Sequence, residues 1–171
     1  MKKYWNLNFW NTGEWQVIEE HLNDLRRSGT IVCPPVSKRF LALETTSPDK
    51  VKVAIFGQDP YPDIDSCTGY AFSAPVDSNV PRTLGMIFDE YESDLHYPYP
   101  TSGDLSAWVE QGVLLWNAIP TCTAGRSLSH DWDEWYPLNK EIISRLSDHN
   151  VVFVFLGSVA RRYAKLVTPW L

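Results

Sequence analysis

The chain has 171 residues, of which 44% are hydrophobic and eight are tryptophan, and its formal net charge is −6 at pH 7. A chain of this length can bury a sizeable core, so we expect one domain over residues 1–171 that needs neither disulfides nor metal. No apolar run reaches the roughly 18 residues of a transmembrane helix, and no signal peptide is recognisable, which excludes a membrane protein and favours a cytoplasmic one. The negative charge argues against nonspecific binding to nucleic acid.

The first predicted elements are a helix and an apolar strand. The helix runs between Asn11, an N-cap candidate, and Gly29, a stop signal. Its apolar residues at helical spacing are Trp15, Ile18, Leu22 and Leu25. Apart from Lys52, the run 51–56 is apolar and rich in β-branched residues, which predicts a strand buried on both faces, as in a parallel sheet.

Helices and strands continue to alternate along the rest of the chain. Helical periodicity predicts helices at 83–95, 138–146 and 158–167, the last carrying three basic residues. Further buried strands are expected at 112–116 and 151–156. This alternation favours a doubly wound α/β fold over separate helical and sheet regions.

Cysteine and histidine spacing gives no indication of a metal or cofactor site. The three cysteines are odd in number, widely spaced and without a CxxC pair, which argues against both a disulfide framework and a zinc site. Three of the four histidines are scattered without ligand spacing: His21, His96 and His149. The fourth, His130, is expected to be a solvated loop residue without a catalytic role.

The turn Gly57–Pro62 carries the strongest chemical signal in the sequence. It places Gln58, Asp59 and Tyr61 directly after a predicted buried strand, at the edge where open α/β sheets bind ligands. An acid, an amide and an aromatic ring on one tight turn indicate a functional site that carries out chemistry. The structural alternative is that Asp59 and Pro60 simply cap the turn.

This turn resembles the water-activating loop of the uracil-DNA glycosylase family, whose hallmark is Gly-Gln-Asp-Pro-Tyr followed by His or Pro. Four later segments resemble family motifs in the same order, so that the likeness covers about residues 5–165. They are Gly69–Ser73, similar to the uracil-stacking segment; Pro81–Thr83, similar to the proline-rich DNA loop; Gly112–Asn117, similar to the base-reading strand; and Phe153–Ser158, similar to the strand ending in the Gly-Ser phosphate loop. The resemblance implies a three-layer α/β fold with a short central parallel sheet and helices on both faces.

The resemblance also implies a reaction, in which the N-glycosidic bond of deoxyuridine in DNA is hydrolysed after base flipping, with release of uracil and an abasic site. Asp59 is then the catalytic residue, because its carboxylate stabilises the oxocarbenium-like sugar and orients the attacking water. Asn117 reads the uracil edge, Tyr61 excludes the thymine methyl group, and Phe72 stacks on the base. Gln58 contributes donors toward the carbonyl O2 of uracil.

Each uracil-binding assignment has a structural alternative: a strand-ending cap for Asn117, a half-buried turn residue for Tyr61, and a core residue for Phe72. By the same resemblance, the DNA-binding residues are Pro81, Thr83, Gly157 and Ser158, for which ordinary helix capping is the alternative.

The implied ligands are uracil and uracil-containing single- or double-stranded DNA, bound by a monomer that needs no metal or cofactor. An inhibitor protein is a further candidate partner in this family.

Two features depart from the family pattern. Pro62 stands where histidine is commonest, and the 171 residues do not include the His-Pro-Ser-Pro-Leu-Ser segment, which supplies a catalytic histidine, a leucine wedge and a fourth edge strand. One hypothesis is a glycosylase whose sequence continues beyond Leu171, and we favour it because an unpaired apolar sheet edge is unusual. The alternative is a uracil- or DNA-binding module with little or no catalysis.

Overall fold

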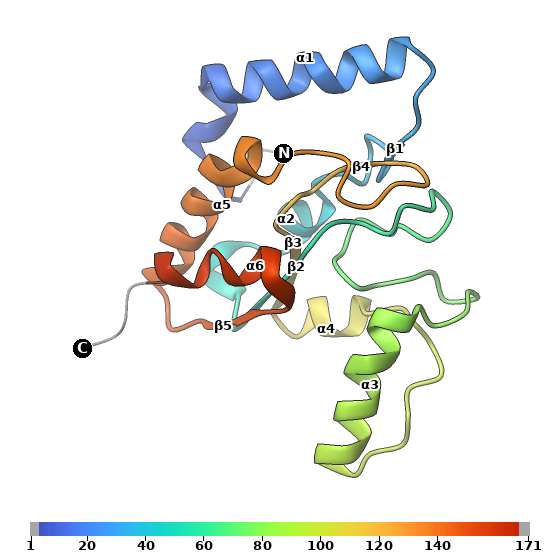
Figure 1. The fold of residues 1–171 in the computed structure, drawn as a ribbon. Coiled ribbons are helices and arrows are strands. Elements are labelled where there is room, and N and C mark those ends of the chain that lie inside the picture. The colour runs from blue at the N-terminus through green and yellow to red at the C-terminus, as the bar shows by residue number, and fades with distance from the viewer. Residues whose placement is uncertain (1–3, 168–171) are drawn as a thin grey trace.

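The computed structural model describes residues 4–167 and shows a three-stranded parallel sheet between layers of helices (Figure 1). The strand order is β3-β2-β5, with β2 at Val53–Gly57, β3 at Val113–Asn117 and β5 at Val152–Phe155. The three predicted strands and the α/β fold class are therefore confirmed. Within the described residues, no helix is long and apolar enough to cross a membrane.

The register of the sheet brings the strand ends to one edge. Val53 lies opposite both Val113 and Val152, and Gly57 at the end of β2 lies opposite Asn117 at the end of β3. Because all three strands are parallel, the loops that follow them leave the sheet on the same side. The turn Gly57–Pro62 and Asn117 are brought together by this pairing.

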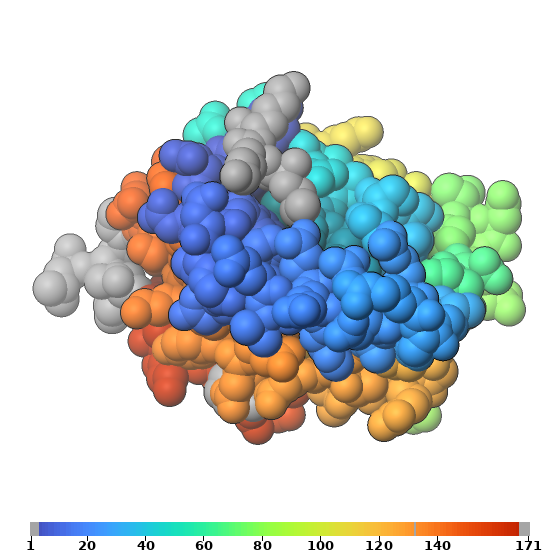
Figure 2. All heavy atoms as spheres, turned by 90° about the horizontal axis from the view of Figure 1, so that it is seen from above, coloured from blue at the N-terminus to red at the C-terminus, as the bar shows by residue number. Residues whose placement is uncertain are grey.

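Each face of the sheet packs on its own group of helices. Ala54 and Phe56 belong to a cluster with residues of α1 (Gly13–Arg27) and α5 (Trp132–Ser147). On the opposite face, Leu115 packs with residues of α3 (Arg82–Leu95) and beside α4 (Ser106–Glu110). Seen from above, the blue atoms of the N-terminal region lie against the orange atoms of the region around α5 (Figure 2), in agreement with the direct contact between α1 and α5.

Several short elements complete the fold and were not predicted. They are β1 (Val32–Cys33), which pairs antiparallel with β4 (Cys122–Thr123), the helix α2 (Leu41–Thr45), and the 3-10 helices η1 (Asn8–Asn11) and η2 (Pro48–Lys50). Elements of two to five residues are too short to show a recognisable period in the sequence.

The predicted helix boundaries need three corrections. The N-cap of α1 is Thr12, whose side chain accepts from Trp15 N, rather than Asn11, which ends η1; Gly29, with φ +81°, follows the helix as expected. Helix α5 begins six residues earlier than predicted, because Asp131 caps it by accepting from the backbone of the first turn. The predicted helix 158–167 is wrong, since it divides into α6 (Gly157–Arg161) and the 3-10 helix η3 (Ala164–Leu166).

The expectation that all three strands are buried is wrong for β5. Val152 is 61% exposed, and the other three residues of β5 are only half-buried. Both β3 and β5 are edge strands among the described residues, but they are covered differently. The central residues of β3 are buried in the clusters on the two faces of the sheet, whereas Phe153 and Phe155 of β5 only pack, partly buried, against one of these clusters.

A buried asparagine joins the end of β3 to the helices behind it. Asn139 is fully buried; its Oδ1 accepts from Trp116 Nε1 at 2.7 Å, and its Nδ2 donates to the carbonyl of Ala118 at 2.7 Å. The same amide also donates to the Trp135 carbonyl and to the Tyr163 hydroxyl. Since Trp116 and Ala118 flank Asn117, this side chain fixes the backbone from which Asn117 projects.

We expect Asn139→Ala to lower the free energy of unfolding by at least about 3 kcal/mol, because several buried polar groups lose their partner together. Urea denaturation of the variant measures this directly. The exposed Asn79→Ala is a matched control that should change stability by less than about 0.5 kcal/mol. A loss below about 1 kcal/mol for Asn139→Ala contradicts the role given to this side chain.

Candidate active site

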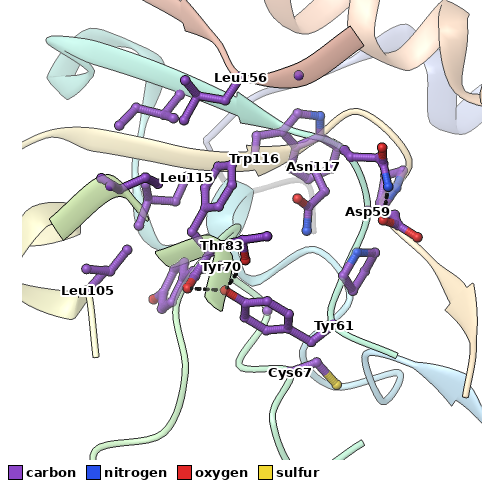
Figure 3. Close-up of a pocket in the computed structure, with 18 of the residues that line it drawn as sticks. Asp59, Tyr61, Cys67, Tyr70, Thr83, Leu105, Leu115, Trp116, Asn117 and Leu156 are labelled. Carbon is purple, nitrogen blue, oxygen red and sulfur yellow. Dashed lines mark hydrogen bonds between the residues drawn. The ribbon is translucent and has the colours of Figure 1, made fainter. Parts of the chain in front are cut away.

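A pocket of about 840 Å³ opens at the carboxyl edge of the sheet (Figure 3). Most of the residues singled out in the sequence line it: Gln58, Asp59, Tyr61, Phe72, Thr83, Asn117 and Gly157. The structure therefore brings together residues that lie up to 99 positions apart, from 58 to 157. Pro81 and Ser158 are not among the lining residues; Ser158 follows Gly157, and Pro81 lies two residues before Thr83.

Gly57 allows two side chains to approach the backbone of β2 closely. A Cβ at this position would lie 2.7 Å from Asn117 Oδ1 and 2.9 Å from Phe72 Cζ. These distances are far shorter than van der Waals contact. The absence of a side chain at Gly57 thus lets the amide of Asn117 and the ring of Phe72 both approach the end of β2.

The carboxylate of Asp59 is held by donors from outside its own turn. Ser127 Oγ lies 2.9 Å from Oδ1 and 2.8 Å from Oδ2, and the backbone N–H of Leu128 donates to Oδ2 at 2.6 Å. The amide of Gln58 donates to Oδ1 at 2.9 Å. The turn-capping alternative for Asp59 does not describe these contacts, because the hydrogen bonds join the turn to a loop 68 and 69 residues away.

Tyr61 and Phe72 are fixed relative to each other by a hydrogen bond. The hydroxyl of Tyr61 donates to the Phe72 carbonyl at 2.8 Å and lies 3.2 Å from Thr83 Oγ1. Burial raises the pKa of the Tyr61 phenol, which keeps it protonated and able to donate. Phe72 has a left-handed φ of +66°, a costly conformation that the Tyr61 hydrogen bond helps to hold.

Asn117 points its side-chain amide toward the centre of the pocket (Figure 3). Among the described residues, no protein group forms a hydrogen bond with this amide. The backbone around it is firmly placed, since Ala118 N donates to the Gly57 carbonyl at 3.0 Å. The site therefore offers one free donor and one free acceptor, side by side, on a rigid strand end.

The amide of Gln58 faces the carboxylate of Asp59 rather than the open pocket. Besides Asp59, its nearest partner is Ser127 Oγ at 3.4 Å. In this arrangement the side chain orients the acid. A contribution of Gln58 toward a ligand carbonyl stays a prediction.

The expected DNA-contacting residues lie at the rim. Pro81 is the N-cap residue of α3, and the exposed Thr83 follows in its first turn. Gly157, with φ +88°, and the exposed Ser158 begin α6. The left-handed backbone at Gly157 explains why glycine occupies this position.

One wall of the pocket is apolar and comes from the face of the sheet that packs on α3 and α4. Its residues include Ile55, Leu105, Trp108, Leu115, Val154 and Leu156. Low polarity on this side strengthens electrostatic interactions with any charge that forms in the pocket.

His130 is buried rather than solvated, which corrects the expectation from sequence. It is 9% exposed, and its Nδ1 lies 2.8 Å from the Thr121 hydroxyl. Burial, with smaller effects from the neighbouring His21 and Arg39, lowers the pKa of His130 to about 4. The imidazole is therefore neutral at pH 7.

The three cysteines, distant in sequence, pack together behind the Gly57–Pro62 turn as free thiols: Cys33, Cys67 and Cys122. Cys122 Sγ donates to the Pro60 carbonyl at 3.5 Å. Burial raises the pKa of both Cys67 and Cys122 to about 12, so these thiols are protonated at pH 7. Within the part of the chain that the structure describes, no group of three metal-binding side chains is placed to hold an ion.

Sequence reasoning missed Ser127 and Leu128, which contact Asp59, and Tyr70, which lines the pocket. Ser127 and Leu128 lie in an irregular loop after β4 and belong to none of the recognised segments. Their proximity to Asp59 arises only from tertiary structure.

Comparison with known proteins identifies relatives across most of the chain. Residues 44–169 match the family described as the uracil DNA glycosylase superfamily. The uracil-DNA glycosylase of Coxiella burnetii (strain CbuG_Q212) is 38% identical over 156 residues, which are 90% of this chain and 68% of the relative. That of Campylobacter hominis is 40% identical over 152 residues, which are 88% of this chain and 65% of the relative. The chain thus spans about two thirds of the length of these curated relatives.

Solved structures show the same fold. The crystal structure of mimivirus uracil-DNA glycosylase gives a TM-score of 0.86 at 26% identity, over 93% of this chain and 60% of that one. A mimivirus UNG variant solved in complex with UGI gives a TM-score of 0.85 at 26% identity, over 92% of this chain and 61% of that one. These likenesses confirm the fold that the sequence motifs implied.

We expect Gly57→Ala to lower the free energy of unfolding by about 1–3 kcal/mol, because the new methyl group overlaps Asn117 and Phe72. Urea denaturation measures the loss, and NMR should show displaced side-chain amide signals of Asn117. Gly13→Ala is the matched control, since no atom lies within 4 Å of a Cβ placed there. Unchanged stability and unchanged Asn117 signals contradict the close packing described for this position.

The lowered pKa of His130 predicts a pH-dependent loss of stability. Below about pH 6.5 the unfolded chain takes up a proton that the folded chain does not accept until about pH 4, so stability is complete above this window and falls as the pH decreases through it. His130 contributes a slope of up to about 1.4 kcal/mol per pH unit. Chemical denaturation at pH 7, 6 and 5 should show a smaller slope for His130→Gln than for the wild type. The exposed His149→Gln should keep the wild-type slope; equal slopes in all three proteins contradict the assignment.

Proposed function

The chain belongs to the uracil DNA glycosylase superfamily, hydrolases that act on N-glycosyl bonds, and we propose that it releases uracil from DNA by hydrolysing the N-glycosidic bond of deoxyuridine. The observation that carries this proposal is the meeting of Asp59, Asn117, Phe72 and Tyr61 around one pocket. The carboxylate of Asp59, the free amide of Asn117 and two aromatic rings are suited to a flat, neutral base attached to a sugar that becomes cationic.

Asp59 supplies the negative charge that the reaction needs. As the glycosidic bond breaks, positive charge develops on the deoxyribose and negative charge on the leaving uracil. The Asp59 carboxylate stabilises the oxocarbenium-like sugar and orients the water that attacks C1′. Its three donors keep the carboxylate in one orientation during this step.

Asn117 distinguishes uracil from cytosine. Its Nδ2 donates to uracil O4, and its Oδ1 accepts the N3 proton. Cytosine presents an amino donor and an unprotonated N3 at these places, which leaves buried groups unpaired at a cost of about 1–3 kcal/mol each. Fixing of the strand end by Asn139 makes this discrimination strict, because the Asn117 backbone cannot shift to adapt.

Tyr61 and Phe72 set the shape of the base site. Phe72 stacks on the flipped base, a contact worth about 1–3 kcal/mol in other base–aromatic pairs. Tyr61 stands against C5, where uracil carries hydrogen and thymine carries a methyl group. The hydrogen bond from Tyr61 to the Phe72 carbonyl holds the two rings at a fixed separation.

The rim contacts the DNA backbone. The Thr83 hydroxyl and the backbone and hydroxyl of Ser158, next to Gly157, hold phosphates on either side of the flipped nucleotide, and Pro81 shapes the loop before α3. These donors add no net charge, which suits a chain of net charge −6.

The proposed ligands are single- or double-stranded DNA containing uracil, and free uracil as product. The UGI complex of the mimivirus relative extends the proposal to a UGI-type protein that binds the same monomeric domain.

The decisive test is release of uracil by the purified 171-residue chain from a single-stranded oligonucleotide with one uracil. We expect release from this strand and none from the same strand with thymine. Asp59→Asn keeps the size of the side chain but removes its charge, and it should slow release by about a hundredfold or more.

The exposed Asp77→Asn is the matched control and should retain wild-type activity. Release that is unchanged in Asp59→Asn contradicts the mechanism. Tight binding of the uracil strand without any release by the wild type supports the alternative, a binding module of the same fold.

A further inference from the structure

The loop that follows β4 contacts the carboxylate of Asp59 through two successive residues. Ser127 Oγ lies within 2.9 Å of both carboxylate oxygens, and the Leu128 N–H donates to one of them at 2.6 Å. Together with the Gln58 amide, these donors contact both oxygens of the acid. A carboxylate held at both oxygens cannot rotate freely about its Cβ–Cγ bond.

The loop itself is held against the Gly57–Pro62 turn. Gly125 N donates to the Pro62 carbonyl at 2.7 Å, and Ser129 Oγ accepts from the backbone of Thr123 at 2.7 Å. Leu128 has a left-handed φ of +55°, which is costly for a leucine. The N–H of the same residue is the group that donates to Asp59.

We propose that Ser127 is a positioning residue for the hydrolysis of the glycosidic bond: its hydroxyl fixes the Asp59 carboxylate in the orientation that stabilises the cationic sugar. This inference rests on the proposed function. Ser127 lines the pocket beside Asp59, and the role proposed for it runs through that carboxylate. Its hydroxyl removes the need for the carboxylate to reorient as the bond breaks, and a preorganised charge is more effective than a mobile one. Gln58 and Leu128 each contact one oxygen, whereas Ser127 Oγ lies within 2.9 Å of both, so that without Ser127 each oxygen keeps a single donor and the carboxylate is held less tightly.

The side chain of Ser127 is suited to a selective experiment. Ser127 is exposed, so that removal of its hydroxyl creates no core cavity and an added methyl group has space. Ser127→Ala therefore removes the contact with Asp59, whereas Ser127→Thr keeps a hydroxyl at the same place. Ser147→Ala, which loses a hydroxyl bonded to the Ile143 carbonyl within α5, is the matched control.

The experiment measures kcat and KM for uracil release from the single-stranded oligonucleotide, together with the melting temperature of each variant. We expect Ser127→Ala to lower kcat by about 10- to 100-fold with KM changed less than about twofold. Ser127→Thr should recover most of the lost kcat, and Ser147→Ala should match the wild type. Equal melting temperatures for Ser127→Ala and the wild type would show that the loss is not one of folding.

The outcomes separate this inference from the proposed function. If the wild type releases uracil and Ser127→Ala has the same kcat, the positioning role alone is overturned. A rise in KM with unchanged kcat, or a failure of threonine to restore activity, also overturns it, because the hydroxyl is then not acting through Asp59. Absence of release by the wild type overturns the proposed function and this inference with it.

Discussion

The parallel pairing of β2 with β3, in the register that sets Gly57 opposite Asn117, is the constraint on which the candidate site depends. A shift of one residue would place Asn117 on the other face of the sheet. The absence of a side chain at Gly57 then permits the amide of Asn117 and the ring of Phe72 to share the space beside the strand end. Backbone pairing thus determines where the base-sized part of the pocket lies.

Two sets of contacts connect this strand pair to the rest of the molecule. Asn139 holds the β3 end from behind through Trp116 and Ala118, and the loop after β4 holds the β2 turn from above through its contacts with Asp59 and Pro62. The hydrogen bonds of Asn139 are buried, where loss of a partner is costly. Those from the loop to Asp59 lie at exposed positions, but together with the Gln58 amide they contact both carboxylate oxygens. The polar parts of the site are therefore rigid before any ligand arrives, which is the condition for electrostatic catalysis.

The sequence was sufficient for features that depend on local pattern, and insufficient for those that depend on tertiary contact. The apolar run before Gly57 predicted β2 and the position of Asp59 at its end, because a strand boundary followed by a distinctive turn is a local signal. The burial of His130 could not be predicted, since it depends on packing beside Thr121 in the folded chain. The exposure of Val152 likewise depends on which other elements cover its strand, and an apolar run does not reveal this.

The few charged groups at the site make the net charge of −6 compatible with DNA binding. Among the described residues that line the pocket, Arg39, Asp59 and Glu90 are the charged ones, and the remaining lining is polar without charge or apolar. An apolar wall raises the effect of Asp59 on a developing cation, while neutral donors at the rim hold phosphates without cancelling that effect. A strongly basic site would attract DNA better but would weaken the single negative charge that the proposed chemistry requires. The acidic composition is therefore compatible with a glycosylase that relies on shape, neutral donors and one well-oriented carboxylate.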